Sequence, residues 1–78
     1  MKHQEIQTAT LKVLSTVLKC EVDLLSSRET LSNWDSLKHI EIIFAMEDEM
    51  KIQFPEEKMS ELNSVIQIIA AVEVLYAT

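Results

Sequence analysis

The chain has 78 residues, of which 47% are hydrophobic, and a formal net charge of −6. This length predicts one domain, residues 1–78, and the hydrophobic fraction is too high for a disordered chain. Because the sequence has no glycine and a single proline, a turn-rich all-β fold is disfavoured. Helices joined by a few loops are the favoured architecture.

Cysteine usage and hydropathy predict a cytoplasmic location. No apolar run approaches the ~20 residues that span a bilayer, and the polar start of the chain does not resemble a secretory signal. Cys20 is the only cysteine, and it has no metal-ligand spacing to His3 or His39. We expect its thiol to be buried as a small apolar group, with no metal site and no membrane association.

The negative charge is concentrated in the second half of the chain. Residues 41–61 hold seven acidic residues against two lysines, whereas acids and bases balance over residues 1–33. Nucleic acid is an unfavourable partner for such a surface, because its phosphates would be repelled. A basic protein surface is the natural complement. The alternative is a solvated acidic face that only aids solubility.

The first part of the chain predicts one helix followed by a long loop. Over residues 3–18 apolar residues recur at spacings of three and four, which indicates an amphipathic helix. Residues 20–34 lose this period and contain serines and an asparagine, which favour turns. We expect Leu25 and Leu31 to tie this loop to the core, and loops of this length are typically functional.

A second and a third helix are predicted next. The second begins at Asp35 or Ser36, which are both favoured N-cap types, and ends near Met50. Pro55 cannot continue a helix, but it suits the first turn of a short third helix over residues 56–61.

A fourth helix completes the predicted fold. Ser64 and Gln67 have the spacing of a capping box, and the apolar pattern then continues to about Tyr76. The chain is therefore predicted to be all-α, a four-helix bundle with three longer helices and one short third helix.

The second helix carries two apolar stripes. One comprises Ile42, Ile43, Met46 and Met50 and suits the core, with His39 at its edge as a packing residue. The other is interleaved with acidic residues, so it would be buried in a central helix or exposed as a docking face for a basic partner. The predicted docking residues are Leu37, Lys38, Ile40, Glu41, Phe44, Glu47 and Asp48.

Ser36 is the most informative single residue. It stands in the sequence Trp34-Asp35-Ser36-Leu37, directly before the acidic helix. The start of a helix presents unpaired N–H groups and the positive end of the dipole, so a phosphate ester on this hydroxyl would be well placed. The alternative is that Ser36 only caps the helix. No base is placed beside it by a hydrolase motif, so a catalytic nucleophile is disfavoured.

These residues resemble acyl carrier proteins. Residues 34–50 are similar to that family's second helix, in which Asp-Ser-Leu precedes an alternation of aliphatic residues and glutamates. Residues 52–55 resemble the connection that follows, and residues 62–65 resemble the start of the last helix. The resemblance covers essentially the whole chain in length and order of elements. The triplet alone is a weak motif, but in register with an acidic helix it is specific.

The resemblance implies a carrier and not an enzyme. A phosphopantetheinyl transferase would place 4'-phosphopantetheine on Ser36, using Mg²⁺ held mainly by that enzyme. Asp35 would orient the site and approach that metal. The arm would hold acyl intermediates as thioesters for partner enzymes of fatty acid, polyketide or related biosynthesis. The implied partners are an acyl- or aminoacyl-loading ligase and downstream synthases with basic docking surfaces, and the carrier itself is expected to be a monomer.

Two residues depart from the pattern of fatty-acid carriers. Trp34 stands where many of those have a small residue, and Lys38 stands where they often have an acid. The chain is therefore more similar to specialised freestanding carriers. Two alternatives stay open: an aminoacyl or peptidyl carrier, and, in a different class, an unmodified acidic helical adaptor that binds a basic partner.

Overall fold

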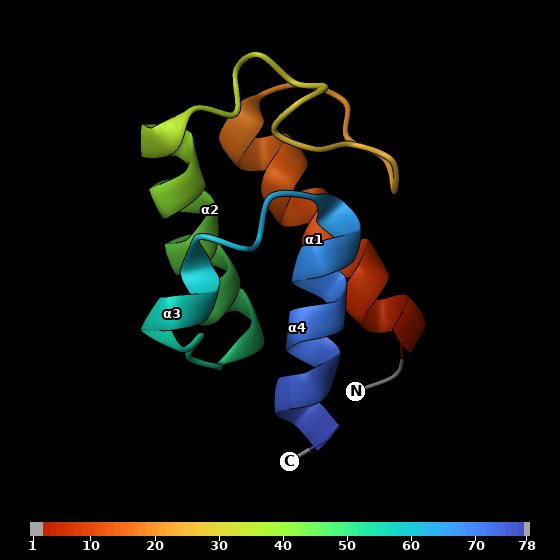
Figure 1. Cartoon of the computed structure of the whole chain (residues 1–78). Coiled ribbons are helices and arrows are strands. Elements are labelled where there is room, and N and C mark those ends of the chain that lie inside the picture. Colours follow the sequence, from red (N-terminus) through yellow and green to blue (C-terminus); the bar gives the residue numbers. More distant parts are fainter. Residues whose placement is uncertain (1–2, 78) are drawn as a thin grey trace.

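The computed structural model describes residues 3–77, and this part of the chain forms four helices (Figure 1). They are α1 (His3–Leu18), α2 (Ser36–Met50), α3 (Glu56–Met59) and α4 (Val65–Ala77). The predicted all-α bundle with a short third helix is thereby confirmed. The predicted bounds of the first helix are those observed, and the second helix also ends at Met50.

Helix α1 is the shared packing partner of the bundle, because both α2 and α4 pack against it. Residues 19–35 form the loop that crosses one end of the bundle and leads into the start of α2 (Figure 1). The short α3 follows the turn at the other end of α2. The start of α2 is therefore set at the end of the bundle where the long loop lies.

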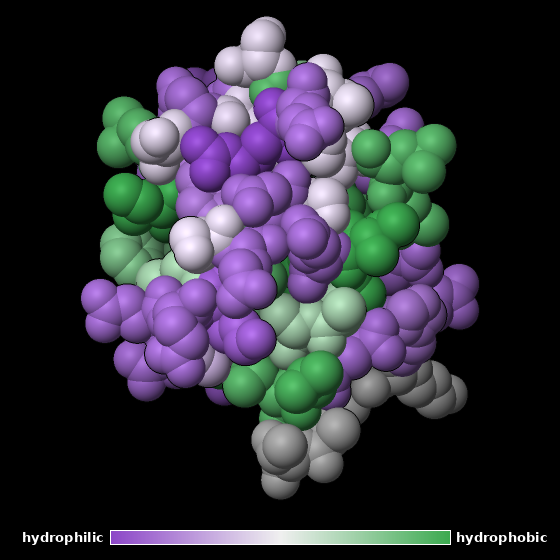
Figure 2. All heavy atoms as spheres, viewed as in Figure 1, coloured by the Kyte–Doolittle hydropathy of each residue, from purple (hydrophilic) through white to green (hydrophobic). Residues whose placement is uncertain are grey.

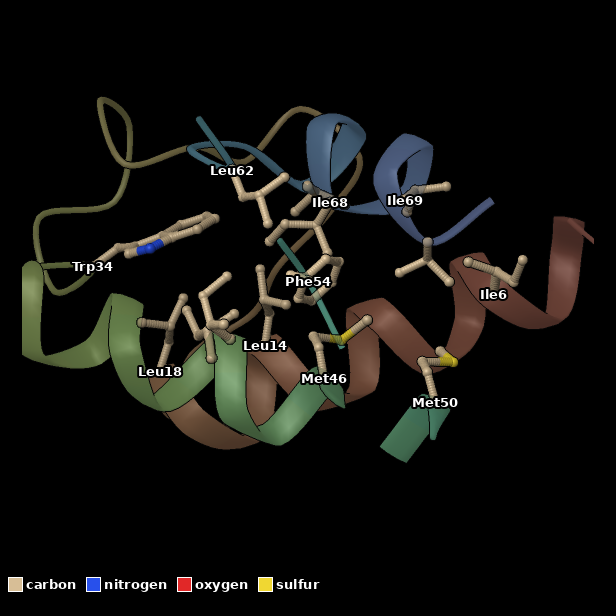
Figure 3. Packing of buried hydrophobic residues seen from close by; sticks show 14 residues of the cluster. Ile6, Leu14, Leu18, Trp34, Met46, Met50, Phe54, Leu62, Ile68 and Ile69 are labelled. Atoms are coloured by element: carbon tan, nitrogen blue, oxygen red, sulfur yellow. The ribbon is translucent and has the colours of Figure 1, made fainter. Parts of the chain in front are cut away.

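The core lies between the three longer helices (Figure 3). Trp34 is 2% exposed and closes one end of it near Leu18, whereas Ile6 and Met50 lie at the other end. Met46 and Met50 are buried, as the apolar stripe predicted. The other buried hydrophobic residues are Leu14, Ile42, Ile43, Phe54, Leu62, Val65, Ile68, Ile69 and Val72.

The long loop is held differently from the prediction. Leu25 is 82% exposed, because its amide binds the Asp23 carboxylate in a tight turn that directs the side chain outward. Leu31 is half-buried against the core, in line with its predicted role. The backbone supplies the other tie, since Val65 N–H donates to the carbonyl of Ser26 at 3.1 Å in an isolated antiparallel bridge.

Two helices end in residues with left-handed backbone geometry. Lys19 follows α1 with φ of 55°, and Lys51 follows α2 with φ of 57°. The amides of Lys51 and Ile52 both donate to the carbonyl of Glu47, which satisfies one of the carbonyls at the end of α2. In a chain without glycine, lysine takes the position that glycine usually fills.

Cys20 and Pro55 also differ from expectation. Cys20 is half-buried and not fully buried, because it follows the left-handed turn at the rim of the bundle, where Asn33 Nδ2 lies 3.4 Å from its sulfur. Pro55 is the N-cap of α3 and not part of its first turn, since its ψ of 140° is extended.

The ends of α3 and α4 lie close to their predicted positions. Helix α3 stops at Met59, two residues before the predicted end, because the backbone beyond it turns back towards α4. At α4, Gln67 N–H donates to the Ser64 hydroxyl at 3.2 Å, as a capping box requires. The Gln67 side chain accepts from Asn63 N–H at 3.0 Å, one residue before the expected donor.

Candidate functional site

Two adjacent residues at the start of α2 differ in their structural roles. Asp35 is the N-cap: its carboxylate accepts from Lys38 N–H at 2.9 Å, and its carbonyl accepts from His39 N–H at 2.8 Å. Ser36 is the first residue of the helix, and its side chain is exposed. The interpretation of Ser36 as the capping residue is therefore wrong.

The Ser36 hydroxyl forms no hydrogen bond within the described residues. The amides of Ser36 and Leu37 likewise have no acceptor among the described residues, because Asp35 accepts only from the amides of Lys38 and His39. Two N–H groups at the positive end of a helix, next to an unengaged hydroxyl, form a site that fits a phosphate ester.

The second apolar stripe of α2 is a surface feature. Leu37 is 66% exposed, Ile40 51% and Phe44 60%. The opposite face, which includes Ile42 and Ile43, is buried. The alternative of a central helix buried on both stripes is therefore wrong. Figure 2 shows hydrophobic side chains along the edge of the molecule where α2 runs in Figure 1.

Charged residues flank this stripe. Lys38 Nζ lies 3.3 Å from Glu41 Oε2, one turn further along the helix, and both side chains are partly exposed. Asp48 is exposed near the end of the helix. The spacings between Leu37, Glu41, Phe44 and Asp48 place them on one side of α2. Six of the seven predicted docking residues thus lie together on the accessible side of this helix.

Glu47, the seventh predicted docking residue, forms hydrogen bonds within the protein. Its Oε2 accepts from Phe54 N–H at 2.8 Å, and its carbonyl takes the amides that close α2. Its side chain is only half-exposed. This carboxylate therefore fixes the connection between α2 and α3, a use that the alternation of apolar and acidic residues does not reveal.

A hollow continues the exposed stripe beyond Phe44. It measures about 550 Å³ and is lined by Phe44, Gln53, Phe54, Pro55, Glu56 and Met59. Sequence reasoning did not find it, because Met59 reaches this place only when the chain folds back after α2. No local pattern signals that contact.

Trp34 and His39 form a buried pair beneath the start of α2. Trp34 Nε1–H donates to His39 Nδ1 at 3.2 Å, and His39 Nε2 lies 2.7 Å from the carbonyl of Met59. The imidazole is 8% exposed, as expected for a packing histidine. Its two hydrogen bonds were not predictable, because they depend on partners five residues before it and twenty residues after it.

Comparison of the chain with models of protein families and with curated proteins gives no match. Within residues 3–77, no helix combines the length and the apolar character needed to cross a membrane. Over the same residues, histidine, cysteine and acidic side chains do not gather in groups of three that could hold a metal ion. The fold and the site define a small helical bundle with an exposed serine at a helix start.

Proposed function

We propose that this protein is a carrier that holds acyl intermediates as thioesters on a 4'-phosphopantetheine arm attached to Ser36. The observation that carries the proposal is that the capping side chain and the exposed hydroxyl at the start of α2 belong to different residues. Asp35 caps the helix, which leaves the Ser36 hydroxyl exposed and unengaged beside two free amides. A serine needed only for capping would instead accept a hydrogen bond from the amide two or three residues further along the helix.

The site suits this prosthetic group chemically. The phosphodiester would lie at the positive end of α2, where a negative charge is stabilised. The arm supplies a terminal thiol for thioester chemistry. This chain contributes the oxygen to which the arm is attached and the surface that partner enzymes bind. The carboxylate of Asp35 is exposed next to the hydroxyl, so it can approach the metal of a modifying enzyme.

The exposed stripe of α2 supports the same proposal from the side of the partners. Leu37, Ile40 and Phe44 supply apolar contact area, while Glu41 and Asp48 steer a basic surface towards it. The stripe begins one residue after Ser36, so a partner docked on it has the arm within reach. The proposed partners are a phosphopantetheinyl transferase, a loading ligase and downstream synthases.

Attachment is tested by intact mass after incubation with coenzyme A, Mg²⁺ and a broad-specificity phosphopantetheinyl transferase. We expect wild type to gain the mass of one phosphopantetheine and Ser36→Ala to gain none. Ser32→Ala is the matched control, because Ser32 is an exposed serine in the loop and should be dispensable for modification. A wild type that stays unmodified would favour the acidic adaptor, and a modified Ser36→Ala would refute the site.

Docking is tested by the kinetics of the same transferase. We expect Ile40→Ala to lower kcat/KM roughly tenfold, as loss of an apolar anchor at an interface does. Ile66→Ala is the control, since Ile66 is 56% exposed but lies on α4. Equal losses for both variants would contradict a docking face confined to α2.

A further inference from the structure

Two buried side chains anchor the start of α2 to the core. Over residues 32–41, all of which the structure describes, only Trp34 and His39 are buried. Figure 3 shows the ring of Trp34 directed into the core from the segment before α2. Asp35 and Ser36 lie between these two anchors in the sequence, and both are exposed. The position of Ser36 relative to the core therefore depends on Trp34 and His39.

Hydrogen bonds connect the two anchors to each other and to the segment between them. Trp34 Nε1–H donates to His39 Nδ1 at 3.2 Å, and His39 N–H donates to the carbonyl of Asp35 at 2.8 Å. Because an indole N–H only donates, His39 carries its proton on Nε2, which donates to the carbonyl of Met59 at 2.7 Å. The segment from Trp34 to His39 is thus closed on itself by one bond between side chains, and a further bond ties it to the end of α3.

The first turn of α2 needs these anchors. Terminal turns of helices open easily, because their first amides have no partner within the helix. Asp35 caps α2 from inside the same segment, since it accepts only from the amides of Lys38 and His39. The cap therefore shapes the turn but does not attach it to the core. The indole and the imidazole provide that attachment.

The proposed modification depends on where the Ser36 hydroxyl lies. Its oxygen attacks the phosphorus of coenzyme A that carries the pantetheine, and a new P–O bond forms. The bond from this phosphorus to the bridging oxygen breaks, adenosine 3',5'-bisphosphate leaves with the electron pair, and a base of the transferase takes the serine proton. Attack requires the oxygen to lie about 3–3.5 Å from the phosphorus. The hydroxyl has no hydrogen bond within the described residues, so only the backbone beneath it fixes its place.

We propose that Trp34 and His39 are positioning residues for the transfer of phosphopantetheine to Ser36. The hydrogen bond between their rings holds the first turn of α2 closed, so the serine oxygen keeps a fixed place relative to the exposed stripe on the same helix. Both rings are buried, so they act on the reaction only through the backbone. This role rests on the proposed carrier function.

The first measurement uses the unmodified protein alone. ¹⁵N relaxation gives the order parameter of each backbone amide, which is about 0.85 in rigid structure and below about 0.6 in flexible segments. Trp34→Phe keeps an aromatic ring in the core but removes the N–H donor. We expect the amides of Ser36 and Leu37 to be rigid in the wild type and flexible in Trp34→Phe. Equal order parameters in both proteins would overturn the positioning role, whether or not the chain is a carrier.

The second measurement separates positioning from docking in the transferase reaction. Because the exposed side chains of α2 are unchanged, we expect Trp34→Phe to lower kcat about tenfold and to leave KM within about twofold of the wild type. An unchanged kcat would contradict the role of the pair. A wild type that gains no phosphopantetheine would refute the carrier function, and with it the purpose of the pair, whatever the order parameters show.

Two substitutions of His39 separate its hydrogen bonds. The amide oxygen of asparagine can replace Nδ1, so His39→Asn can still accept from Trp34. The amide nitrogen of glutamine can replace Nε2, so His39→Gln keeps only the bond to Met59. We expect His39→Gln to lower kcat as far as Trp34→Phe does, and His39→Asn to retain most of the wild-type kcat. The reverse order would overturn the proposal. These two variants test the same bond even if Trp34→Phe does not fold.

A matched control separates positioning from a general loss of stability. Val72 is fully buried in the second half of α4, so Val72→Ala destabilises the core without removing a partner of Trp34 or His39. All rates are compared at a temperature at which each variant is folded. We expect Val72→Ala to keep the wild-type kcat. A tenfold loss in Val72→Ala would show that kcat follows stability, which would contradict a specific role for the pair.

Discussion

The residues at the start of α2 show how one helix end can serve structure and chemistry together. Asp35 satisfies two amides, one with its side chain and one with its backbone. Ser36 is then not needed to cap the helix, although serine is itself a favoured N-cap residue. Had Ser36 been the cap, a phosphate ester on its oxygen would have weakened the hydrogen bond that begins the helix.

This division of labour predicts different costs for two adjacent substitutions. Asp35→Ala should lower the free energy of unfolding by about 1 kcal/mol, because it removes the acceptor of Lys38 N–H. Ser36→Ala should change it by less than about 0.5 kcal/mol, because its hydroxyl makes no internal bond. Urea denaturation of both variants measures the difference. A larger loss for Ser36→Ala would show that its hydroxyl supports the helix.

Two isoleucines one turn apart on α2 make a matched pair, because one is exposed and the other is buried. Ile40 is 51% exposed, so Ile40→Ala should change stability by no more than about 0.5 kcal/mol. Ile43 is 2% exposed, so Ile43→Ala leaves a cavity and should cost about 2–5 kcal/mol. Thermal or urea unfolding compares them. A similar loss for both would mean that the exposed stripe is covered in solution.

At the scale of the elements, the ends of the helices are informative, because the chain has no glycine that could take a left-handed conformation there. A left-handed conformation costs a residue with a side chain about 1–2 kcal/mol, and both Lys19 and Lys51 adopt it. At Lys51 the cost is offset by the bonds from two amides to the carbonyl of Glu47 and by a positive charge near the negative end of α2.

Glycine should therefore be a stabilising replacement at the end of α2. Lys51→Gly removes the steric cost but loosens the unfolded chain, so we expect a net gain of about 0.5–1 kcal/mol. Lys12→Gly, within α1, should instead cost about 1 kcal/mol. Chemical denaturation of the two variants tests both signs. A destabilised Lys51→Gly protein would mean that the lysine side chain contributes more than the strain costs.

Element bounds were predictable where the governing signals are local. The helical period of α1 and the cap at Asp35 act within a few residues, so both helices were placed correctly. The exposed position of Leu25 and the internal bond of Glu47 were not foreseen, because each depends on a backbone turn.

The features of the candidate site likewise differ in whether local sequence could predict them. The serine motif and the exposed stripe are properties of one helix, and periodicity locates them. Whether that stripe is buried depends on how many neighbours the helix has, and the pattern left both outcomes open. The ties from Trp34 and Met59 to His39 required the folded chain, since they join residues on three segments.

At the scale of the whole molecule, the net charge of −6 sets how partners approach. Lys38 is the exception on the exposed side of α2, although its charge is partly compensated by Glu41 at 3.3 Å. A field of one sign raises the rate of encounter with an oppositely charged surface, and salt weakens it.

Lys38→Glu should therefore speed association with a transferase whose docking surface is basic. The rate should rise severalfold at low salt, and the gain should fall as ionic strength approaches 0.15 M, where charges are screened beyond about 8 Å. Stopped-flow association across a salt series measures this effect. Lys12→Glu on α1 is the control for net charge alone. Equal rates for wild type and Lys38→Glu at low salt would contradict the prediction.

The backbone bridge between the long loop and the start of α4 has a consequence for the order in which the chain folds. Arg28 and Asn63, which bond to each other there, are 35 residues apart, so their contact closes a long loop whose entropy must be lost first. Helices α1 and α2 need only local contacts to begin forming. The bridge should thus form after the transition state, and Asn63→Ala should accelerate unfolding in a chevron plot while leaving the refolding limb nearly unchanged.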